Sequence, residues 1–366
     1  MRPLVPTLSM QVTYQCNIEC KHCGPYCGPK EKDWMSLDEM KRLIAQASEL
    51  GALNVVFTGG EPTLLGKDLV TLLRFIRDET SIASTRMVTN AKWATSYLRA
   101  HRLLKEWQEA GLVELNISCG EYHQEFVPIT DVVTAFKAAR DLDYKTVLLV
   151  GEFLKEGRGN FSEQDFHAAL GEGFMSPDLI SPYVSEVHGF SCGSAMNYGR
   201  GEEYLKTEDL TFIDEDQIPS ICSDVLSAIT VHPNGNTTAC CGIMMRDESL
   251  LNIGNWRENS LRSLVEEANN DIILNWIGYV GLKDMKRWLQ EKDPTINFRD
   301  KYINICDLCA EIVYNKRCQE ILVEHGHERA DDIIANRVAL DATAYGAAEF
   351  QYETPAEAAA YVEVAG

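Results

Sequence analysis

Long apolar runs and an excess of positive charge are both missing from this sequence. No run of about 18 apolar residues occurs, so we expect no membrane-spanning helix and no membrane partner. The first residues, MRPLVPTLSMQ, lack the apolar stretch and the cleavage site of a secretory signal peptide, which favours a cytoplasmic protein. Lys and Arg number 34 against 55 Asp and Glu, a net charge of −21. Such an acidic surface repels phosphate backbones, so nucleic acid is not an expected partner.

Cysteine, in contrast, is plentiful. The chain has 12 cysteines, and most of them fall in three short segments, at residues 16–27, 222–241 and 306–318. Disulfides are rare in the reducing compartment that we expect for this protein. Clusters of cysteine at short spacings are typical of metal or iron–sulfur ligation instead.

Apolar patterning predicts strands that alternate with helices through the first half of the chain. This alternation favours parallel βαβ units, in which functional residues gather at the carboxyl ends of the strands. The first cysteine cluster and the segments TGGEP, VTNA and SCG all follow predicted strands. The predicted strands are 7–15, 54–60, 84–91, 112–120, 145–154 and 184–192, and the predicted helices are 36–51, 69–79, 96–111, 132–143 and 162–173.

The pattern changes near residue 215. Residues 229–241 predict a hairpin with Asn234-Gly235 as its turn, and helical segments follow at 260–291 and 306–324. The tail after Val338 is rich in alanine and has no Lys or Arg, which predicts a loosely packed or disordered end. We therefore divide the chain into a core at 1–214, a smaller unit at 215–325 and a tail at 326–366.

The spacing Cys16-x3-Cys20-x2-Cys23 cannot lie on one face of a regular helix or strand. It requires a loop that wraps around a ligand, and three thiolates at this spacing suit an iron–sulfur cluster with one open corner. A zinc site is the alternative, although structural zinc usually takes four protein ligands. Cys27 follows the triplet, and we expect it to be a small buried residue, because a fourth thiolate would close the open corner.

The triplet and the motifs after the next strands together resemble the radical S-adenosylmethionine superfamily. The resemblance extends over residues 8–205 and includes an aromatic residue, His22, directly before the third cysteine. The other matching segments are GGEP at 59–62, VTNA at 88–91, NIS at 116–118 and NYGRG at 197–201.

The resemblance implies a partial (β/α)6 TIM-like barrel in which Cys16, Cys20 and Cys23 hold a [4Fe–4S] cluster. It implies that this cluster reductively cleaves S-adenosylmethionine, and that the resulting 5′-deoxyadenosyl radical removes a hydrogen atom from a substrate. Many relatives carry an arginine soon after the fourth strand for the cofactor carboxylate, whereas this chain has none there before Arg140. Ser118 or His123 is the expected substitute, with an ordinary loop histidine as the alternative for His123. The implied cofactor-binding residues are Gly59, Gly60, Glu61, Pro62, Thr89, Asn90 and Ser118.

A second cysteine set has the order Cys222, Gly235-x4-Cys240, then Cys306-x2-Cys309. Taken alone, these cysteines also suit a zinc site. Their order resembles the SPASM/twitch domains of radical enzymes, and the shorter twitch version implies one auxiliary [4Fe–4S] cluster bound by the four cysteines. Side chains alternate along a strand, so Cys241 competes with Cys240 for one position. Cys318 is expected to be a buried structural residue.

The predicted function is hydrogen-atom abstraction from a ribosomally made precursor peptide, leading to a crosslink, an epimerisation or an oxidation. The alternatives are a small-molecule dehydrogenase or epimerase and, in another class, a non-catalytic zinc-binding scaffold. Cys119 and Cys192 end predicted strands and are candidate hydrogen-atom donors, with ordinary core residues as the alternative. The expected partners are a reductant such as flavodoxin or ferredoxin and a separate peptide-recognition protein, because the chain begins almost on its first strand.

Overall fold

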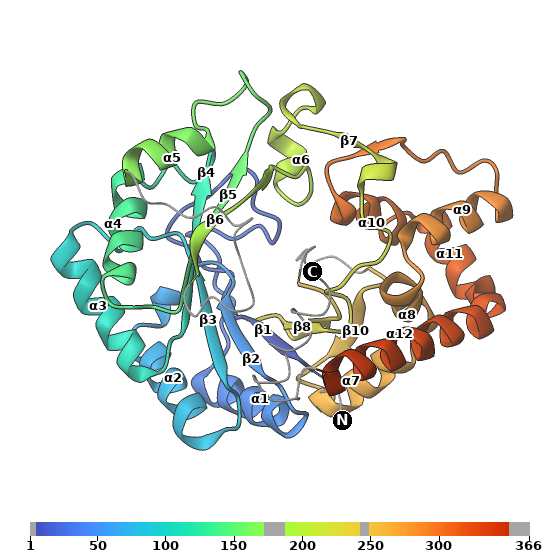
Figure 1. The fold of residues 1–366 in the computed structure, drawn as a ribbon, viewed down its shortest axis with the longest axis horizontal. Helices are drawn as coiled ribbons and strands as arrows, with labels where there is room; N and C mark the ends of the chain where they lie inside the picture. The colour runs from blue at the N-terminus through green and yellow to red at the C-terminus, as the bar shows by residue number, and fades with distance from the viewer. Residues whose placement is uncertain (1–4, 172–186, 242–248, 351–366) are drawn as a thin grey trace, which may run out of the picture.

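Six parallel strands form the centre of the fold in the computed structural model, which describes residues 5–171, 187–241 and 249–350 (Figure 1). Each strand pairs in parallel with the next along the chain, so that Thr7 lies level with Asn54 and Thr146 lies level with Val187. The predicted α/β fold with a parallel sheet is confirmed, and residues 184–186 of the predicted sixth strand lie outside the described residues. The strands are β1 (Thr7–Gln11), β2 (Asn54–Thr58), β3 (Ser84–Thr89), β4 (Glu114–Gly120), β5 (Thr146–Phe153) and β6 (Val187–Ser194).

Helices follow the strands and cover the outer face of the curved sheet (Figure 1). The first one begins at the predicted capping box, in which the Glu39 N–H donates to Ser36 Oγ at 3.3 Å and the Ser36 N–H donates to the Glu39 carboxylate at 2.8 Å. The helices of this half are α1 (Leu37–Glu49), α2 (Lys67–Glu79), α3 (Tyr97–Ala110), α4 (Ile129–Arg140), α5 (Glu163–Leu170) and α6 (Gly201–Tyr204), with 3₁₀ turns η1 (Pro62–Leu65), η3 (Thr207–Asp209) and η4 (Glu215–Gln217).

The predicted hairpin at 229–241 is present, but it extends the barrel sheet instead of standing apart from it. Strand β8 (Ala228–Val231) pairs in parallel with β1, and β9 (Asn236–Thr238) and β10 (Asn252–Asn255) continue the sheet antiparallel. The sheet therefore has the order β10-β9-β8-β1-β2-β3-β4-β5-β6. The hairpin covers what would otherwise be an open edge of β1. The division at residue 215 stays a prediction.

The remaining helices form the second half of the molecule, on the right of Figure 1. A short ladder, in which Lys301 lies level with Asp214, connects this half back to the end of the barrel. Its elements are α7 (Leu261–Asn270), α8 (Ile272–Tyr279), α9 (Leu282–Lys292), α10 (Ile305–Val313), α11 (Lys316–His325), η5 (Gly326–Arg329) and α12 (Ala330–Phe350), with β7 (Ile213–Asp214) pairing β11 (Lys301–Tyr302).

The expectation of disorder after Val338 is wrong as far as Phe350, because α12 runs through this segment. Loose packing of this end stays a prediction, since Val338 is 62% and Leu340 43% exposed. Alanine has the highest intrinsic helix propensity, which outweighs the weak apolar periodicity. Helix α12 is held to the preceding helices by Arg337, whose Nη1 donates to Asn275 Oδ1 at 2.8 Å, and by the fully buried Ile333. Residues 351–366 lie outside the described residues.

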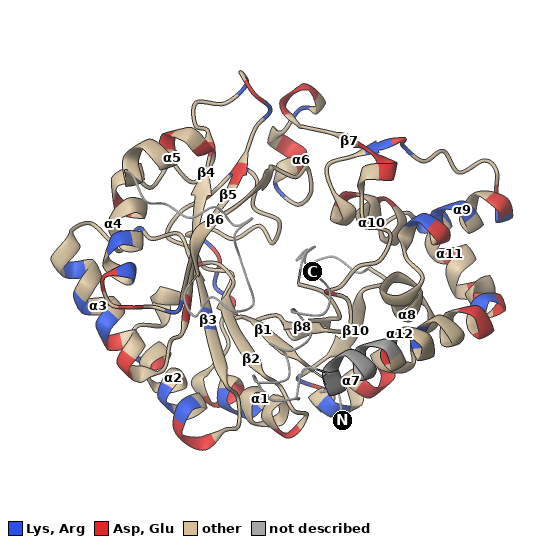
Figure 2. Ribbon diagram, in the orientation of Figure 1, with Lys and Arg blue, Asp and Glu red and all other residues tan. Residues whose placement is uncertain are grey.

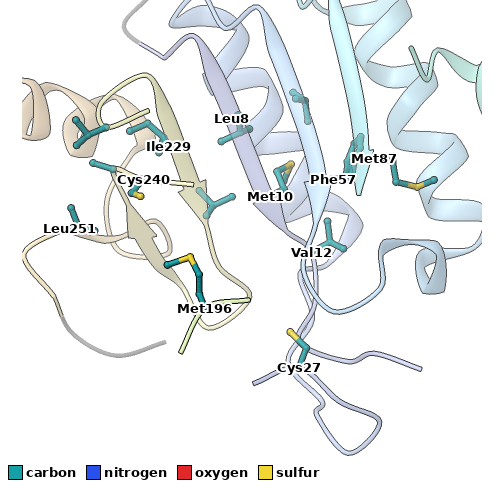
Figure 3. Packing of buried hydrophobic residues seen from close by; sticks show 14 of the residues in the cluster. Leu8, Met10, Val12, Cys27, Phe57, Met87, Met196, Ile229, Cys240 and Leu251 are labelled. Atoms are coloured by element: carbon teal, nitrogen blue, oxygen red, sulfur yellow. The ribbon is translucent and has the colours of Figure 1, made fainter. Parts of the chain in front are cut away.

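The two faces of the strands differ in polarity. Leu8 and Met10 of β1 are fully buried among apolar neighbours such as Phe57 (Figure 3). Successive side chains of a strand point to opposite faces, so Ser9 and Gln11 point to the barrel interior, where they are buried as well. The inward face of β1 therefore carries polar side chains, in contrast to its outward face. Among the described residues, the helices are all too short or too polar to cross a membrane.

Candidate active site

The first four cysteines lie on one loop that follows β1 and closes on itself. The Cys16 N–H donates to the Gly28 carbonyl at 3.1 Å, and the Gly28 N–H donates to the Tyr14 carbonyl at 3.1 Å. Residues from both ends of the loop line one cavity of about 190 Å³, and the four cysteines Cys16, Cys20, Cys23 and Cys27 are among them. The fold thus brings together the three predicted cluster ligands, and it brings Cys27 to the same cavity.

Burial makes the thiols of Cys16 and Cys20 hard to ionise. Cys16 is 6% exposed, and burial, together with the nearby Glu61 and Cys23, raises the pKa of its thiol to about 12. A buried thiolate needs a compensating positive charge, and a bound metal supplies one because metals take the deprotonated form. The site therefore has the chemistry of a metal-binding pocket.

Two glycines at the end of β2 press against the start of the cysteine loop. The Gly60 N–H donates to the Thr13 carbonyl at 2.7 Å, and the Glu61 N–H donates to the Gln15 carbonyl at 3.0 Å. A β-carbon on Gly60 would lie 1.9 Å from the Gln15 carbonyl oxygen, and Gly59 has a φ of +125°. Only glycine fits this close approach. Both glycines line the cavity, as the predicted cofactor contact requires.

Glu61 itself points under the loop. Its carboxylate is fully buried and accepts from the Thr89 hydroxyl at 2.7 Å and from the Asn90 N–H at 2.9 Å. Neither Glu61 nor the buried Pro62 lines the cavity, whereas Thr89, Asn90 and Ser118 do. The Glu61 side chain therefore ties the end of β2 to the end of β3, a role that its motif did not reveal.

Two neutral histidines form another wall. His22 Nε2 lies 3.3 Å from the Glu152 carboxylate, and the His22 and His123 rings meet edge to face with centroids 4.9 Å apart. Burial lowers the pKa of His22 to about 4 and that of His123 to about 3. Because His123 is neutral, it can form a hydrogen bond with a cofactor carboxylate but not an ion pair. Its buried Nδ1 has no hydrogen-bond partner within the described part of the chain. Sequence reasoning missed Glu152, whose only signal was its place at the end of a strand.

Arg200 holds the cysteine loop from the segment after β6. Its Nη1 donates to the Cys20 carbonyl and its Nη2 donates to the Cys27 carbonyl, each at 2.8 Å, and its backbone N–H donates to the Cys23 carbonyl at 3.1 Å. Nearby, Tyr198 lines the same cavity and packs onto the loop. The segment NYGRG attracted notice in the sequence, but nothing there indicated which of its residues contacts the cysteine loop.

The candidate hydrogen-atom donors Cys119 and Cys192 lie on the other face of the sheet. Cys119 of β4 and Cys192 of β6 both lie level with Gly151 of β5, the strand between them. Cys119 is fully buried. Their neighbours Ser118 and Glu152 line the cavity, so by alternation the two thiols point away from it. Their catalytic role stays a prediction, and their orientation favours the alternative of ordinary structural residues.

The predicted auxiliary cysteines gather between the hairpin and α10. Burial raises the pKa of the Cys309 thiol, and the adjacent thiols of Cys240, Cys222 and Cys306 raise it further. Cys306 and Cys309 are one helical turn apart and so share a face of α10. Cys240 comes from the other side, next to Ile229 and Leu251 (Figure 3).

The two remaining cysteines of this half differ. Cys241 is close enough to Cys306 to raise the pKa of its thiol, so it lies at the margin of the group. Cys318 is fully buried in α11, where the charges that raise its pKa come from Glu311 and Asp293 and not from other thiols.

Among the described residues, no three His, Cys, Asp or Glu side chains converge as the ligands of a single metal ion do. Zinc would require its sulfur ligands about 2.3 Å from one point. A [4Fe–4S] cluster takes each thiolate at a different iron, so its ligands lie further apart. The thiols of Cys16, Cys20 and Cys23 line one cavity together with the backbone of Gly59 and Gly60, so this first donor set has space beside it for a group larger than one ion.

The sequence profile described as "Radical SAM superfamily" matches residues 10–153. The chain is 22% identical to the "Putative peptide biosynthesis protein YydG" of Bacillus subtilis over 84% of this chain and 91% of that protein. It is 31% identical to the GTP 3′,8-cyclase of Cronobacter sakazakii over 38% of this chain, and it spans less than half of that relative, 44%.

Two solved structures resemble the fold. Native anSMEcpe with bound AdoMet is 14% identical, with a TM-score of 0.48 over 89% of this chain and 99% of that one. BtrN in complex with AdoMet and 2-DOIA is 18% identical, with a TM-score of 0.44 over 76% of this chain and 88% of that one.

Proposed function

We propose that this chain is a radical SAM enzyme, as the match of residues 10–153 to the model of that superfamily supports, and that it abstracts a hydrogen atom from a peptide substrate. The observation that carries the proposal is the cavity at the carboxyl ends of the strands. Cys16, Cys20 and Cys23 line it together with Gly59 and Gly60. Three thiols therefore face the space in which the family's cofactor would bind.

A [4Fe–4S] cluster with S-adenosylmethionine supplies one-electron cleavage of the sulfonium bond and the means to remove a hydrogen atom. The chain's own residues hold and shield that chemistry. Gly59 and Gly60 offer backbone groups at close range, while Ser118 and Asn90 offer side-chain hydrogen bonds at the same cavity. His22 and His123 line the same cavity, and their burial lowers their pKa values and so favours the neutral rings.

An auxiliary [4Fe–4S] cluster at Cys222, Cys240, Cys306 and Cys309 is the second part of the proposal. Support comes from Cys306 and Cys309, whose thiol pKa values are raised by burial and then by Cys240 and Cys222, so these two thiols lie near both of them. In this position a cluster would accept the electron that remains after hydrogen abstraction, or would contact the substrate.

The peptide substrate is supported by the name of the Bacillus subtilis relative, whose similarity extends over most of both chains. A ribosomally made precursor peptide is the substrate class that we propose, with a separate protein to recognise it. Deuterium transfer from a labelled peptide into 5′-deoxyadenosine tests this class directly, and transfer only from a small molecule would refute it.

Replacing Cys16 with alanine is expected to abolish the cleavage of S-adenosylmethionine, because the cluster loses a ligand. The measurement is 5′-deoxyadenosine formed anaerobically with dithionite after iron and sulfide reconstitution. The matched variant is Cys27→Ala, which changes a thiol on the same loop and lining the same cavity. It should retain cleavage and cost about 1 kcal/mol of stability for the lost packing.

Two results would contradict this assignment. Equal loss of product in both variants would make Cys27 a ligand as well. Absence of 5′-deoxyadenosine from the unmodified protein, with its clusters intact, would refute the proposed reaction.

Replacing Cys309 with alanine is expected to lower the iron content from about eight to about four atoms per chain, because one of two clusters is lost. Cys318→Ala is the control, since Cys318 is equally a buried helical thiol but lies away from the group. It should keep about eight iron atoms per chain. Iron and acid-labile sulfide are measured together; one zinc atom and no sulfide would identify a scaffold instead of an enzyme.

A further inference from the structure

A second cavity, of about 440 Å³, lies on the outer side of the cysteine loop, between α2 and α3. Asn17 lines it, whereas the residues on either side, Cys16 and Ile18, line the reaction cavity. This stretch of loop is therefore a thin wall between the two cavities. Lys67, Lys92 and Arg99 also line the outer cavity, and the proposed function uses none of them.

The cavity lining carries three cations, Lys67, Lys92 and Arg99, against one carboxylate, Glu106, so its net charge is opposite to that of the chain. Residues 80–105 contain five Lys or Arg and no Asp or Glu, although the protein as a whole carries −21. Figure 2 shows basic and acidic residues on both α2 and α3, and the acidic residues of α3, Glu106 and Glu109, lie in its carboxyl-terminal part. Within residues 5–171, 187–241 and 249–350, Lys67, Lys92 and Arg99 form no ion pair. These three cations are free to attract a negatively charged partner.

Apolar side chains stand beside the cations. Leu64 lines the cavity and is 39% exposed, and Leu98, next to Arg99, is 83% exposed. Arginine and exposed apolar residues together are typical of protein–protein interfaces, in which apolar contacts give affinity and charges give steering. We name Leu64, Lys67, Lys92, Leu98 and Arg99 the basic patch.

The basic patch is close to a predicted cluster ligand. Lys92 Nζ donates to the Asn17 carbonyl at 3.0 Å. Asn90 Nδ2 lies 2.8 Å from Asn17 Oδ1 and 3.6 Å from Cys16 Sγ. One residue and one hydrogen bond therefore separate the patch from the Cys16 thiol, on the side away from the reaction cavity.

We propose that the basic patch is the docking surface for an acidic protein that donates single electrons. The inference rests on the proposed function, which consumes one electron from outside for each S-adenosylmethionine cleaved. The donor is oxidised by one electron, and the metal site at Cys16 is reduced by the same electron. Docking at the patch leaves the reaction cavity open for substrate, and the acidic remainder of the surface repels the donor from other approaches.

The test compares two variants with the same charge change in the reconstituted enzyme. The patch variant is Lys67→Glu with Arg99→Glu, and the control is Arg262→Glu with Lys316→Glu, on exposed parts of α7 and α11. The probe is flavodoxin, whose affinity is measured by calorimetry at low salt. We expect the Kd to rise about tenfold or more in the patch variant, and far less in the control. Added salt should reduce the difference, because it screens exposed charges.

Turnover is measured with reduced flavodoxin and, separately, with dithionite. The patch variant should lose activity with flavodoxin and keep it with dithionite, which needs no docking surface. Equal weakening of flavodoxin binding in both variants would overturn the proposal. Normal flavodoxin binding with weakened binding of an acidic peptide would also overturn it, and would make the patch a substrate contact. Failure of the dithionite reaction in the unmodified enzyme would refute the proposed function, while the binding isotherms would still decide the docking question.

Discussion

Replacing Gly60 with alanine is expected to lower the free energy of unfolding by about 3 kcal/mol and to prevent iron from being retained. The new β-carbon would lie 1.9 Å from the Gln15 carbonyl oxygen, a backbone atom that cannot rotate away. The loop must shift, and the hydrogen bond from the Glu61 N–H to Gln15 is lost with it. Cys16 is the next residue, so the displacement reaches the first predicted ligand. Denaturant unfolding and iron content after reconstitution measure the two effects.

Gly193→Ala is the matched control for stability. Gly193 lies in β6, and a β-carbon there would meet nothing within 4 Å. Its substitution should leave stability unchanged or raise it by about 0.4–1 kcal/mol, since alanine restricts the unfolded chain. A Gly60→Ala protein that unfolds like the Gly193→Ala protein and binds the same amount of iron would refute the close packing of the two loops.

Replacing Arg200 with methionine is expected to lower the free energy of unfolding by about 2 kcal/mol. Methionine keeps the apolar stem but removes the two guanidinium hydrogen bonds, to the carbonyls of Cys20 and Cys27. The loop should open more often, so alkylation of Cys20 and Cys23 in the metal-free protein should become faster. Mass spectrometry of the labelled peptides measures this rate at each cysteine.

Arg287→Met serves as the control, because Arg287 pairs with Asp284 at the surface, where its side chain is 68% exposed. Loss of an exposed pair costs about 0.5 kcal/mol or less, and it should not change thiol alkylation. Arg200→Lys separates charge from geometry, since lysine cannot make the two-pronged contact. Full protection of the thiols by lysine would show that charge alone holds the loop.

The order of strands and helices was predictable because apolar periodicity is a local property. Ser36 and Glu39 form the capping box that their spacing predicts, and the six parallel strands follow the predicted order. The helix that runs through the tail as far as Phe350 was not predicted, because alanine favours a helix even where no amphipathic face is evident. The hairpin was recognised from its turn, Asn234-Gly235. Its pairing with β1 was not, because β1 lies more than 200 residues earlier in the chain and local patterns do not record such a pairing.

By itself, the sequence determined the spacing of the cysteines, the glycines beside them and the strand ends on which they lie. These features are local, since a few consecutive residues set each of them. Only the tertiary structure decided that Glu61 turns under the loop, that Cys119 points away from the cavity and that Arg200 holds Cys20 from 180 residues away. Such contacts form when the sheet curves and brings loops together, so no pattern of neighbouring residues records them. The same curvature places Lys67, Lys92 and Arg99, which form no ion pair within the described part of the chain, around a cavity that Asn17 lines.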